Sequence, residues 1–321
     1  MKKRISIFSP AYNEEGNIER CYEEVRAIMA PLSDRYEYEH LFGDNCSTDR
    51  TLEILRGLAV KDHRVKILAY TRNWGPNRSG MTLLRHCTGD AVIPLPSDLQ
   101  EPVAMIPQFI NLWEQGNEIV YGIYTNHADG ILTKLLRLGY YWLVNKLSNE
   151  PLLSNYSGFG IWDRKVAGVL AGLDDFNPNA RGVLATIGFK STRITYTRIG
   201  RKAGKSSYTF AAYLDEAINA IITHSLVPIR LATLLGLALS GFSLFAAFAY
   251  AMVKIFNWGF QAPGATTTIV LVLFFSGIQL FFLGMLGEYI GAIHAQVRRG
   301  PFILIRERIN FDDPPSEDPR A

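Results

Sequence analysis

Three short polar segments hold most of the side chains in the first half of the chain that could do chemistry. They span residues 9–15, 44–51 and 96–102, and each follows a strand-like apolar run. Asp44 could accept hydrogen bonds from a ribose or from the edge of a base. Asp98 and Gln100 offer oxygens at alternate positions, which suits a hard divalent cation whose other ligands are waters and phosphate oxygens. The segments therefore predict a site for a nucleotide and a cation.

The elements around these segments alternate between strand-like and helix-like patterns. Apolar runs predict strands at residues 4–9, 38–43, 65–69, 91–95 and 119–124, and amphipathic patterns predict helices at residues 17–29, 51–61, 77–87 and 103–115. This alternation predicts an α/β fold with a mostly parallel sheet and helices on both faces. Ligands bind such sheets beyond the carboxyl ends of the strands, so the three polar segments should meet in one crevice.

Taken singly, the polar segments also have purely structural interpretations. Asp49 stands just before the helix expected from Thr51 and could cap it. Asp98 could be an ordinary turn residue. The prediction of a site depends on all three segments lying at consecutive strand ends of one sheet.

The apolar content of the chain is concentrated near its C-terminal end. Of the 321 residues, 48% are hydrophobic, and two charge-free runs at residues 232–253 and 266–287 follow an ordinary soluble composition. Because about 20 apolar residues span a bilayer, the runs predict a transmembrane hairpin, against the alternative of two core helices in a soluble protein. Basic residues flank the pair on both sides, whereas the connecting loop has Lys254 alone, so both termini are expected in the cytosol.

Several further features complete the organisation. Residues 130–147 predict a helix in the membrane interface, against an ordinary packed helix, and residues 209–226 predict a second amphipathic helix. The acidic, proline-rich tail from Asp312 predicts disorder. The net charge of +3 gives no support for nucleic-acid binding. The three cysteines lack paired or metal-type spacing, which predicts reduced thiols.

In this order the motifs resemble those of family 2 glycosyltransferases of the GT-A fold, over about residues 4–305. The matching segments read P-A-Y-N-E at 10–14, D-N-C-S-T-D-R-T at 44–51, R-N-W-G at 72–75, D-L-Q-E-P at 98–102 and R-K-A-G-K-S-S-Y at 201–208. Behind them come G-E-Y-I-G at 287–291 and R-R-G-P at 298–301. Within the family, this layout is similar to that of polyprenyl-phosphate glycosyltransferases, such as dolichol-phosphate mannose synthases and bactoprenol glucosyltransferases.

The resemblance implies an inverting enzyme that moves a sugar from a nucleotide-diphosphate sugar to undecaprenyl or dolichyl phosphate. It implies Asp98, Arg201 and Lys205 as catalytic residues, and Asp98 and Gln100 as ligands of Mg²⁺ or Mn²⁺. The residues expected to contact the nucleotide-sugar are Pro10, Tyr12, Asn13, Glu14, Asp44, Asn45, Ser47 and Asp98. Those expected in a loop near the acceptor phosphate are Arg201, Lys205, Ser206, Ser207 and Tyr208.

Two departures from the family pattern keep other functions open. Pro96 replaces the first aspartate of the metal segment, and Gly158-Phe159-Gly160 stands where many relatives have Asp-Phe-Arg. These changes keep open a rival hypothesis, an impaired sugar-nucleotide-binding subunit that supports a flippase or polymerase. A polysaccharide synthase is the other rival, but it would normally carry a Gln-x-x-Arg-Trp segment and more membrane spans.

The predicted organisation has four parts. A GT-A catalytic domain covers residues 1–208, a juxtamembrane helix 209–228, a two-helix transmembrane hairpin 229–293 and a cytosolic C-terminal segment 294–321. The expected location is a membrane, with the bacterial inner membrane favoured. Gly277, Gly284, Gly287 and Gly291 would permit close helix packing in a homo-oligomer.

Overall fold

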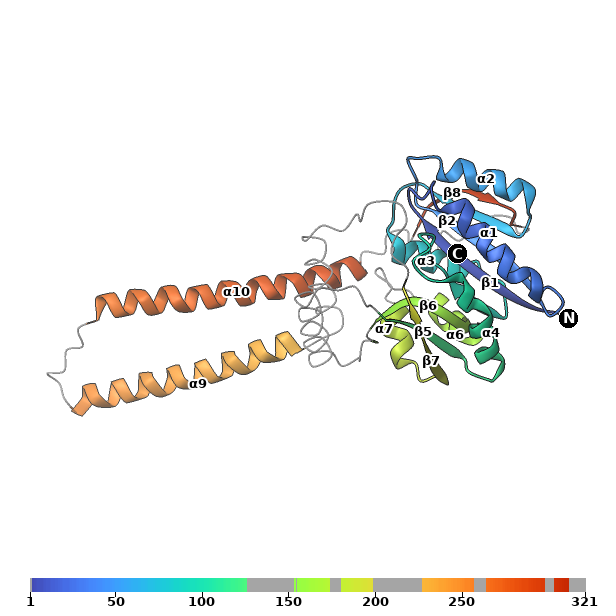
Figure 1. The fold of residues 1–321 in the computed structure, drawn as a ribbon. Helices are drawn as coiled ribbons and strands as arrows, with labels where there is room; N and C mark the ends of the chain where they lie inside the picture. Colours follow the sequence, from blue (N-terminus) through green and yellow to red (C-terminus); the bar gives the residue numbers. More distant parts are fainter. Residues whose placement is uncertain are drawn as a thin grey trace. The chain divides into compact units, whose positions relative to one another are not determined.

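The computed structural model describes residues 2–125, 153, 155–173, 180–198, 227–256, 264–297 and 303–311. The chain divides into two compact units. One unit is an α/β body that includes the C-terminal residues 303–311, and the other contains helices α9 and α10 (Figure 1). The expected helices at 130–147 and 209–226, the loop at 201–208 and the tail from Asp312 lie outside the described residues.

The body is built on an eight-stranded sheet in the order β7-β5-β6-β4-β1-β2-β3-β8. The five predicted strands are confirmed as β1 to β5, the first five in chain order, and the sequence predicts none of the other three. The strands are β1 Lys3–Ala11, β2 Tyr36–Asp44, β3 Val65–Tyr70, β4 Ala91–Pro94, β5 Ile119–Thr125, β6 Tyr156–Asp163, β7 Ser191–Thr197 and β8 Ile305–Ile309.

The sheet is mixed rather than mostly parallel. Its centre, β4-β1-β2-β3, is parallel as predicted, whereas β6 runs antiparallel between β4 and β5, and β8 runs antiparallel to β3. Because β6 is antiparallel to both β4 and β5, β5 is parallel to β4, and β7 is parallel to β5. The strands β1, β2, β3, β4, β5 and β7 therefore all end at the same edge. We call this edge of the sheet the carboxyl edge.

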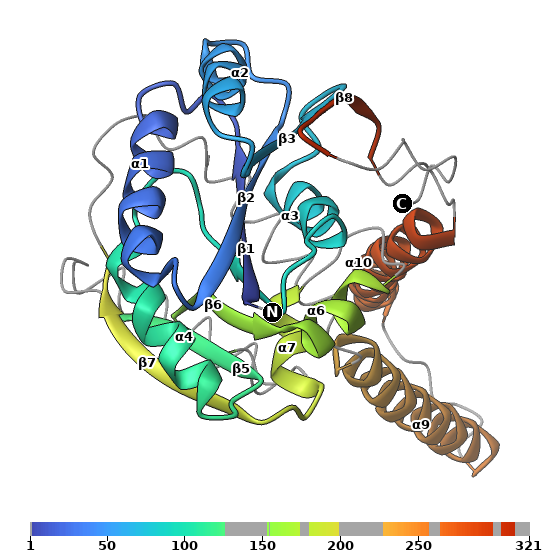
Figure 2. The ribbon, with the colours of Figure 1, turned by 90° about the vertical axis from the view of Figure 1, so that its right-hand side faces the viewer.

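Helices cover both faces of the sheet, as the alternating pattern predicts (Figure 2). One face packs against α1 Ile18–Met29, α2 Thr51–Lys61 and α4 Ile106–Glu114; the other packs against α3 Pro76–Arg85, α6 Arg164–Ala171 and α7 Ala180–Thr186. Successive strand side chains point to opposite faces, so Ile7 belongs to the first core and Phe8 to the second. This two-sided burial fixes the register of the strands and therefore the place of every residue at the carboxyl edge.

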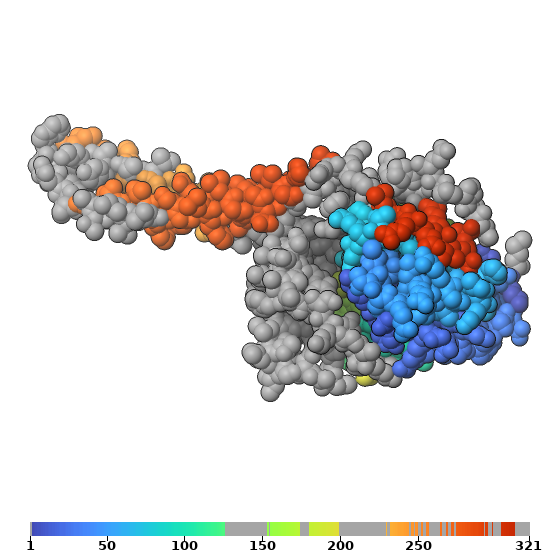
Figure 3. Space-filling view, turned by 90° about the horizontal axis from the view of Figure 1, so that it is seen from above, coloured from blue at the N-terminus to red at the C-terminus, as the bar shows by residue number. Residues whose placement is uncertain are grey.

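The C-terminal strand β8 belongs to the sheet of the α/β body. Arg56 and Glu307 form a salt bridge of 2.5 Å, and the Asn310 amide donates to the carbonyls of Ala59 (2.9 Å) and Val65 (2.8 Å). Figure 3 shows residues 303–311 in red against the blue and cyan part of the body. The sequence predicts no strand at residues 305–309, because five residues after a long apolar region give little strand signal. It therefore assigns them to the separate C-terminal segment 294–321.

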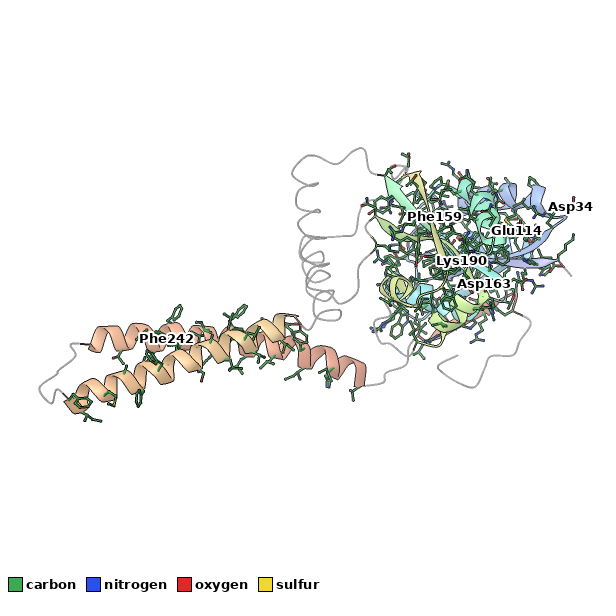
Figure 4. The ribbon with its side chains drawn as sticks, turned by 90° about the horizontal axis from the view of Figure 1, so that it is seen from below. Asp34, Glu114, Phe159, Asp163, Lys190 and Phe242 are labelled. Carbon is green, nitrogen blue, oxygen red and sulfur yellow. The ribbon has the colours of Figure 1, made fainter. Side chains whose placement is uncertain are left out.

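The second unit holds two long helices, α9 Val227–Phe256 and α10 Ala265–Val297. Large apolar side chains are exposed along both, including Phe242, which is 69% exposed (Figure 4). Among the described residues, Phe274–Gly291 in α10 is long and apolar enough to cross a membrane, with 6% of it buried, and α9 has the shorter apolar stretch Ala232–Ser243. On these criteria α10 meets the expectation of a spanning helix, and the span in α9 stays a prediction.

Candidate functional site

The first two polar segments are bonded to each other at the carboxyl edge. The Asn13 amide N–H donates to Ser47 Oγ at 3.0 Å, and the Thr48 N–H donates to Asn13 Oδ1 at 2.8 Å. The Glu14 N–H donates to Thr51 Oγ1 at 2.8 Å. These bonds hold Asn13, Glu14 and Ser47 together, as the parallel arrangement of β1 and β2 predicts.

The third segment joins the others through β1. Ser97 Oγ donates to the carbonyl of Pro10 at 2.9 Å, and within the segment the Gln100 N–H donates to Asp98 Oδ1 at 3.2 Å. Asp98 and Gln100 are both half-buried. Burial raises the pKa of the nearby Cys21 thiol to about 12, and the charges of Asp98 and Glu14 add to the rise, so both carboxylates lie within electrostatic range of α1.

Each of the three segments contains a residue with left-handed backbone geometry. The φ angles are 53° at Asn13, 60° at Cys46 and 55° at Leu99. This conformation costs about 1–2 kcal/mol for most residues, although Asn tolerates it better. Strained residues of this kind are often found at functional sites, and here they cluster at the predicted crevice.

Asp44 is the most enclosed carboxylate of the predicted site. It ends β2 between Ala11 and Ala69, is 1% exposed, and accepts the Ser47 N–H at 3.3 Å. Burial raises the pKa of Asp44, while the hydrogen bonds from Ser47 oppose the rise. The next residue, Asn45, accepts the N–H of Trp74 at 3.4 Å, which brings the segment at 72–75 to the same edge. A buried carboxylate with this surrounding is suited to accept hydrogen bonds from a ligand that excludes water.

The oxygen donors at Asp98 and Gln100 fit a hard divalent cation. Among the described residues no three His, Cys, Asp or Glu side chains gather closely enough to hold a metal by themselves. One carboxylate and one amide oxygen suit Mg²⁺ or Mn²⁺ when diphosphate oxygens and waters complete the shell. Because position 96 is a proline and offers no second carboxylate, a cation at this site would depend on the phosphate oxygens of a bound nucleotide for its remaining charged ligands.

The glycines at 158 and 160 are built into the start of β6. Gly158 has a φ of +104°, and a Cβ at Gly160 would lie 2.1 Å from the carbonyl oxygen of Val120. A larger residue at either position would need a different backbone path. This part of the edge is therefore shaped around glycine at both positions.

Sequence reasoning missed a polar cluster on the β7 side of the carboxyl edge. It contains Glu101, Ser157, Tyr196 and Arg198, joined by hydrogen bonds and one ion pair. Glu101 directly follows the metal segment, and that position could have drawn attention to it. Ser157 and Tyr196 belong to strands that the sequence does not predict, and Arg198 directly follows one of them.

The remaining predicted residues lie outside the described part of the chain. They are Arg201, Lys205, Ser206, Ser207 and Tyr208. Pro10, Tyr12 and Asn45 are described and lie at the carboxyl edge, with Tyr12 41% exposed. Their roles, like those of Asn13, Glu14, Asp44, Ser47, Asp98 and Gln100, stay predictions that the positions make testable.

An open cavity of about 420 Å³ lies at the opposite edge of the sheet. Its lining comprises Trp113, Gly116, Asn117, Glu118, Asp163, Lys165 and Lys190. Asp163 and Lys190, labelled in Figure 4, flank the beginnings of β5 and β7. Asp163 is already engaged, because it accepts the Trp113 indole N–H at 2.8 Å and the Lys165 N–H at 3.0 Å.

Comparison with known proteins gives two matches along the chain. Residues 6–167 match glycosyl transferase family 2, and residues 228–293 match the GtrB C-terminal hairpin. A bactoprenol glucosyl transferase of Shigella phage SfX is 33% identical over 95% of this chain and 99% of its own length. An uncharacterized glycosyltransferase of Bacillus subtilis is 31% identical over 96% of this chain and 95% of its own length. The solved structure of a mannosyltransferase of Pyrobaculum calidifontis, in complex with GDP-Man and Mn²⁺, has 17% identity and a TM-score of 0.49. The match covers 93% of this chain and 87% of the mannosyltransferase chain.

Proposed function

Because the chain belongs to glycosyl transferase family 2, we propose that it transfers a sugar from a nucleotide-diphosphate sugar to a polyprenyl phosphate at the cytosolic face of a membrane. The observation that carries this proposal is the match over nearly the whole chain, hairpin included, to a bactoprenol glucosyl transferase. The convergence of the three polar segments at one edge of the sheet supports a nucleotide-sugar site there.

The proposed donor site uses the residues at the ends of β1, β2 and β4. Asp44 and Asn45 accept hydrogen bonds from the nucleoside, and the segment of Pro10, Tyr12, Asn13 and Glu14, with Ser47, forms the wall around it. Asp98 and Gln100 would hold Mg²⁺ or Mn²⁺, and the cation would neutralise charge on the diphosphate leaving group. Asp98 thereby contacts both the donor and the ion.

The proposed transfer needs little acid–base chemistry from the protein. A phosphate monoester is already anionic at neutral pH, so its oxygen can attack the anomeric carbon without a general base. The new carbon–oxygen bond forms as the bond to the nucleoside diphosphate breaks, on the opposite side, and the configuration inverts. Catalysis then rests on orientation and on charge stabilisation. Arg201 and Lys205 are the cations proposed to bring the two phosphates together.

The hairpin is proposed to hold the enzyme at the membrane that contains its acceptor. Both α9 and α10 would span the bilayer, with the catalytic body and both termini in the cytosol. This orientation follows from the basic residues that flank the hairpin and from the short, nearly uncharged loop between the helices. Two helices are too few to form a transport pathway alone, so an anchoring role fits them best.

A donor screen tests the proposed function directly. Detergent-solubilised protein is incubated with a short-chain polyprenyl phosphate, Mg²⁺ or Mn²⁺ and each common nucleotide-sugar, and lipid-linked product is measured by mass spectrometry. We expect product with one donor. If the protein binds a nucleoside diphosphate yet forms no product with any donor, the impaired subunit suggested by Pro96 and Gly158 becomes the better hypothesis.

The thiol of Cys46 offers a test of the nucleotide site that needs no turnover. Cys21 and Cys87 are buried, whereas Cys46 is partly exposed between Asn45 and Ser47. We expect maleimide to label Cys46 alone in the native protein, and UDP or GDP with Mn²⁺ to slow this labelling, measured by peptide mass spectrometry. A Cys46→Ser variant controls for labelling elsewhere. An unchanged labelling rate at saturating nucleotide contradicts the proposed location.

A further inference from the structure

A fully buried carboxylate lies directly beyond the proposed metal segment. Glu101 is 0% exposed and follows Gln100 in the chain. Its Oε1 lies 3.3 Å from Arg198 Nη2 and accepts the Tyr196 hydroxyl at 3.4 Å. Burial raises the pKa of Glu101, and the Arg198 charge opposes the rise.

The pair is poorly arranged for stability. Arginine and carboxylate groups commonly meet as a two-pronged fork, which satisfies two N–H groups and both oxygens. Here Glu101 Oε2 and Arg198 Nε are buried without a hydrogen-bond partner among the described residues. Replacing a buried ion pair with apolar residues is often neutral or stabilising. Stability alone therefore gives a weak reason for this pair.

The location of the pair gives a better reason, because it connects four strand ends at the carboxyl edge. Glu101 closes the segment after β4, and Tyr196 and Arg198 lie at the end of β7. Ser157 Oγ, at the start of β6, lies 3.2 Å from the Tyr196 hydroxyl oxygen. The Arg198 guanidinium lies 5.2 Å from the ring centre of Tyr124, near the end of β5.

The segments on either side of the pair carry the proposed chemistry. Asp98 is three residues before Glu101, and its charge is close enough to raise the pKa of Glu101. Arg201 is three residues after Arg198. The ion pair between Glu101 and Arg198 thus ties the segment that contains Asp98 and Gln100 to the end of β7.

We infer that Glu101 and Arg198 form a positioning pair, which holds Asp98 and Gln100 in the arrangement that binds the cation with the nucleotide diphosphate. Glu101 contacts neither substrate nor ion in this role and acts through the segment in which it lies, residues 96–102. The inference rests on the proposed function, from which it takes the roles of Asp98 and Gln100.

The test measures how much Mn²⁺ strengthens nucleotide binding, by calorimetry with UDP or GDP, whichever binds more tightly. Glu101→Gln keeps the shape of the side chain and removes its charge. We expect it to reduce the Mn²⁺-dependent gain in affinity about tenfold, the equivalent of one lost hydrogen bond to a charged group, and to leave the metal-free affinity unchanged. Arg198→Met should have the same effect, the double variant should lose no more than either single variant, and Arg198→Lys should recover part of the gain.

The matched control is Glu39→Gln, which disrupts another buried ion pair of the same sheet. Glu39 lies 2.7 Å from Lys66 Nζ and pairs with Ser6 in the first half of β1, away from the carboxyl edge. This variant should lower the melting temperature and leave the Mn²⁺ effect unchanged. The inference is overturned if folded Glu101→Gln keeps the full Mn²⁺-dependent gain in nucleotide affinity. It is also overturned if Glu39→Gln loses as much of that gain, or if Mn²⁺ does not change the nucleotide affinity of the wild type. Because no product is needed, the result stands apart from the donor screen.

Discussion

Asp98→Ala is expected to lower turnover by about 10²–10³-fold or more while the protein stays folded. The side chain is half-buried, accepts the Gln100 N–H within its own segment and belongs to neither apolar core, so its removal should leave the cores on both faces of the sheet intact. The loss arises because the diphosphate leaving group would no longer be neutralised by a correctly held cation. Lipid-linked product formation at saturating donor measures the effect, with circular dichroism as the check on folding.

Asp34→Ala provides the control for that experiment. Asp34 is an exposed aspartate in the turn before β2, at the edge of the sheet opposite the carboxyl edge (Figure 4). This variant removes the same charge and should keep wild-type turnover. Full activity in folded Asp98→Ala would disprove the assignment of Asp98 as a metal ligand.

Asp44→Asn is expected to weaken nucleotide binding by about 10–100-fold. Hydrogen bonds from the nucleoside to the charged carboxylate contribute about 1.5–3 kcal/mol, and the neutral amide of the variant forms weaker ones. Its effect on stability should have the opposite sign. Burial raises the pKa of Asp44 in the folded protein, so the ionised form is disfavoured on folding. Stability from this group is present at low pH and is lost as pH rises through the folded-state pKa.

The asparagine variant should therefore be as stable as the wild type at neutral pH, or more stable. Its Oδ1 can still accept the N–H of Ser47, which lies 3.3 Å from the Asp44 oxygens. Calorimetry with UDP or GDP and thermal unfolding between pH 4 and pH 8 test the two effects. Weaker nucleotide binding together with a lower melting temperature at neutral pH would point to a structural role for Asp44 instead.

The central part of the fold could be predicted because each element there carries a complete local signal. The apolar runs ending at Ser9, Gly43 and Leu95 are bounded by polar turns, and the helix from Thr51 to Lys61 begins and ends as its pattern predicts. The parallel arrangement then brings Asn13 to Ser47 and Ser97 to Pro10, although these residues are far apart in the chain.

The outer strands could not be predicted because their pairing depends on distant segments. β6 carries glycines where it approaches β5, and β7 has mostly half-exposed or exposed side chains, so neither has a strong apolar pattern. Glu101 and Arg198 are 97 residues apart, and only the antiparallel insertion of β6 brings their strands to one edge. The residues of the proposed donor site can therefore be predicted from local motifs, whereas the cluster of Glu101 and Arg198 beside β7 can be found only once this topology is known.

The position of β8 has a consequence for the order in which the protein is made. Until β8 is present, β3 is an outer strand with unpaired N–H and C=O groups, which invite pairing with other chains. The residues of β8 come after α10, so a ribosome synthesises the whole hairpin before the catalytic sheet can be completed. Nascent chains would thus reach the bilayer with an open sheet. A water-soluble version of the body must also supply residues 303–311, or its β3 edge becomes a site of aggregation.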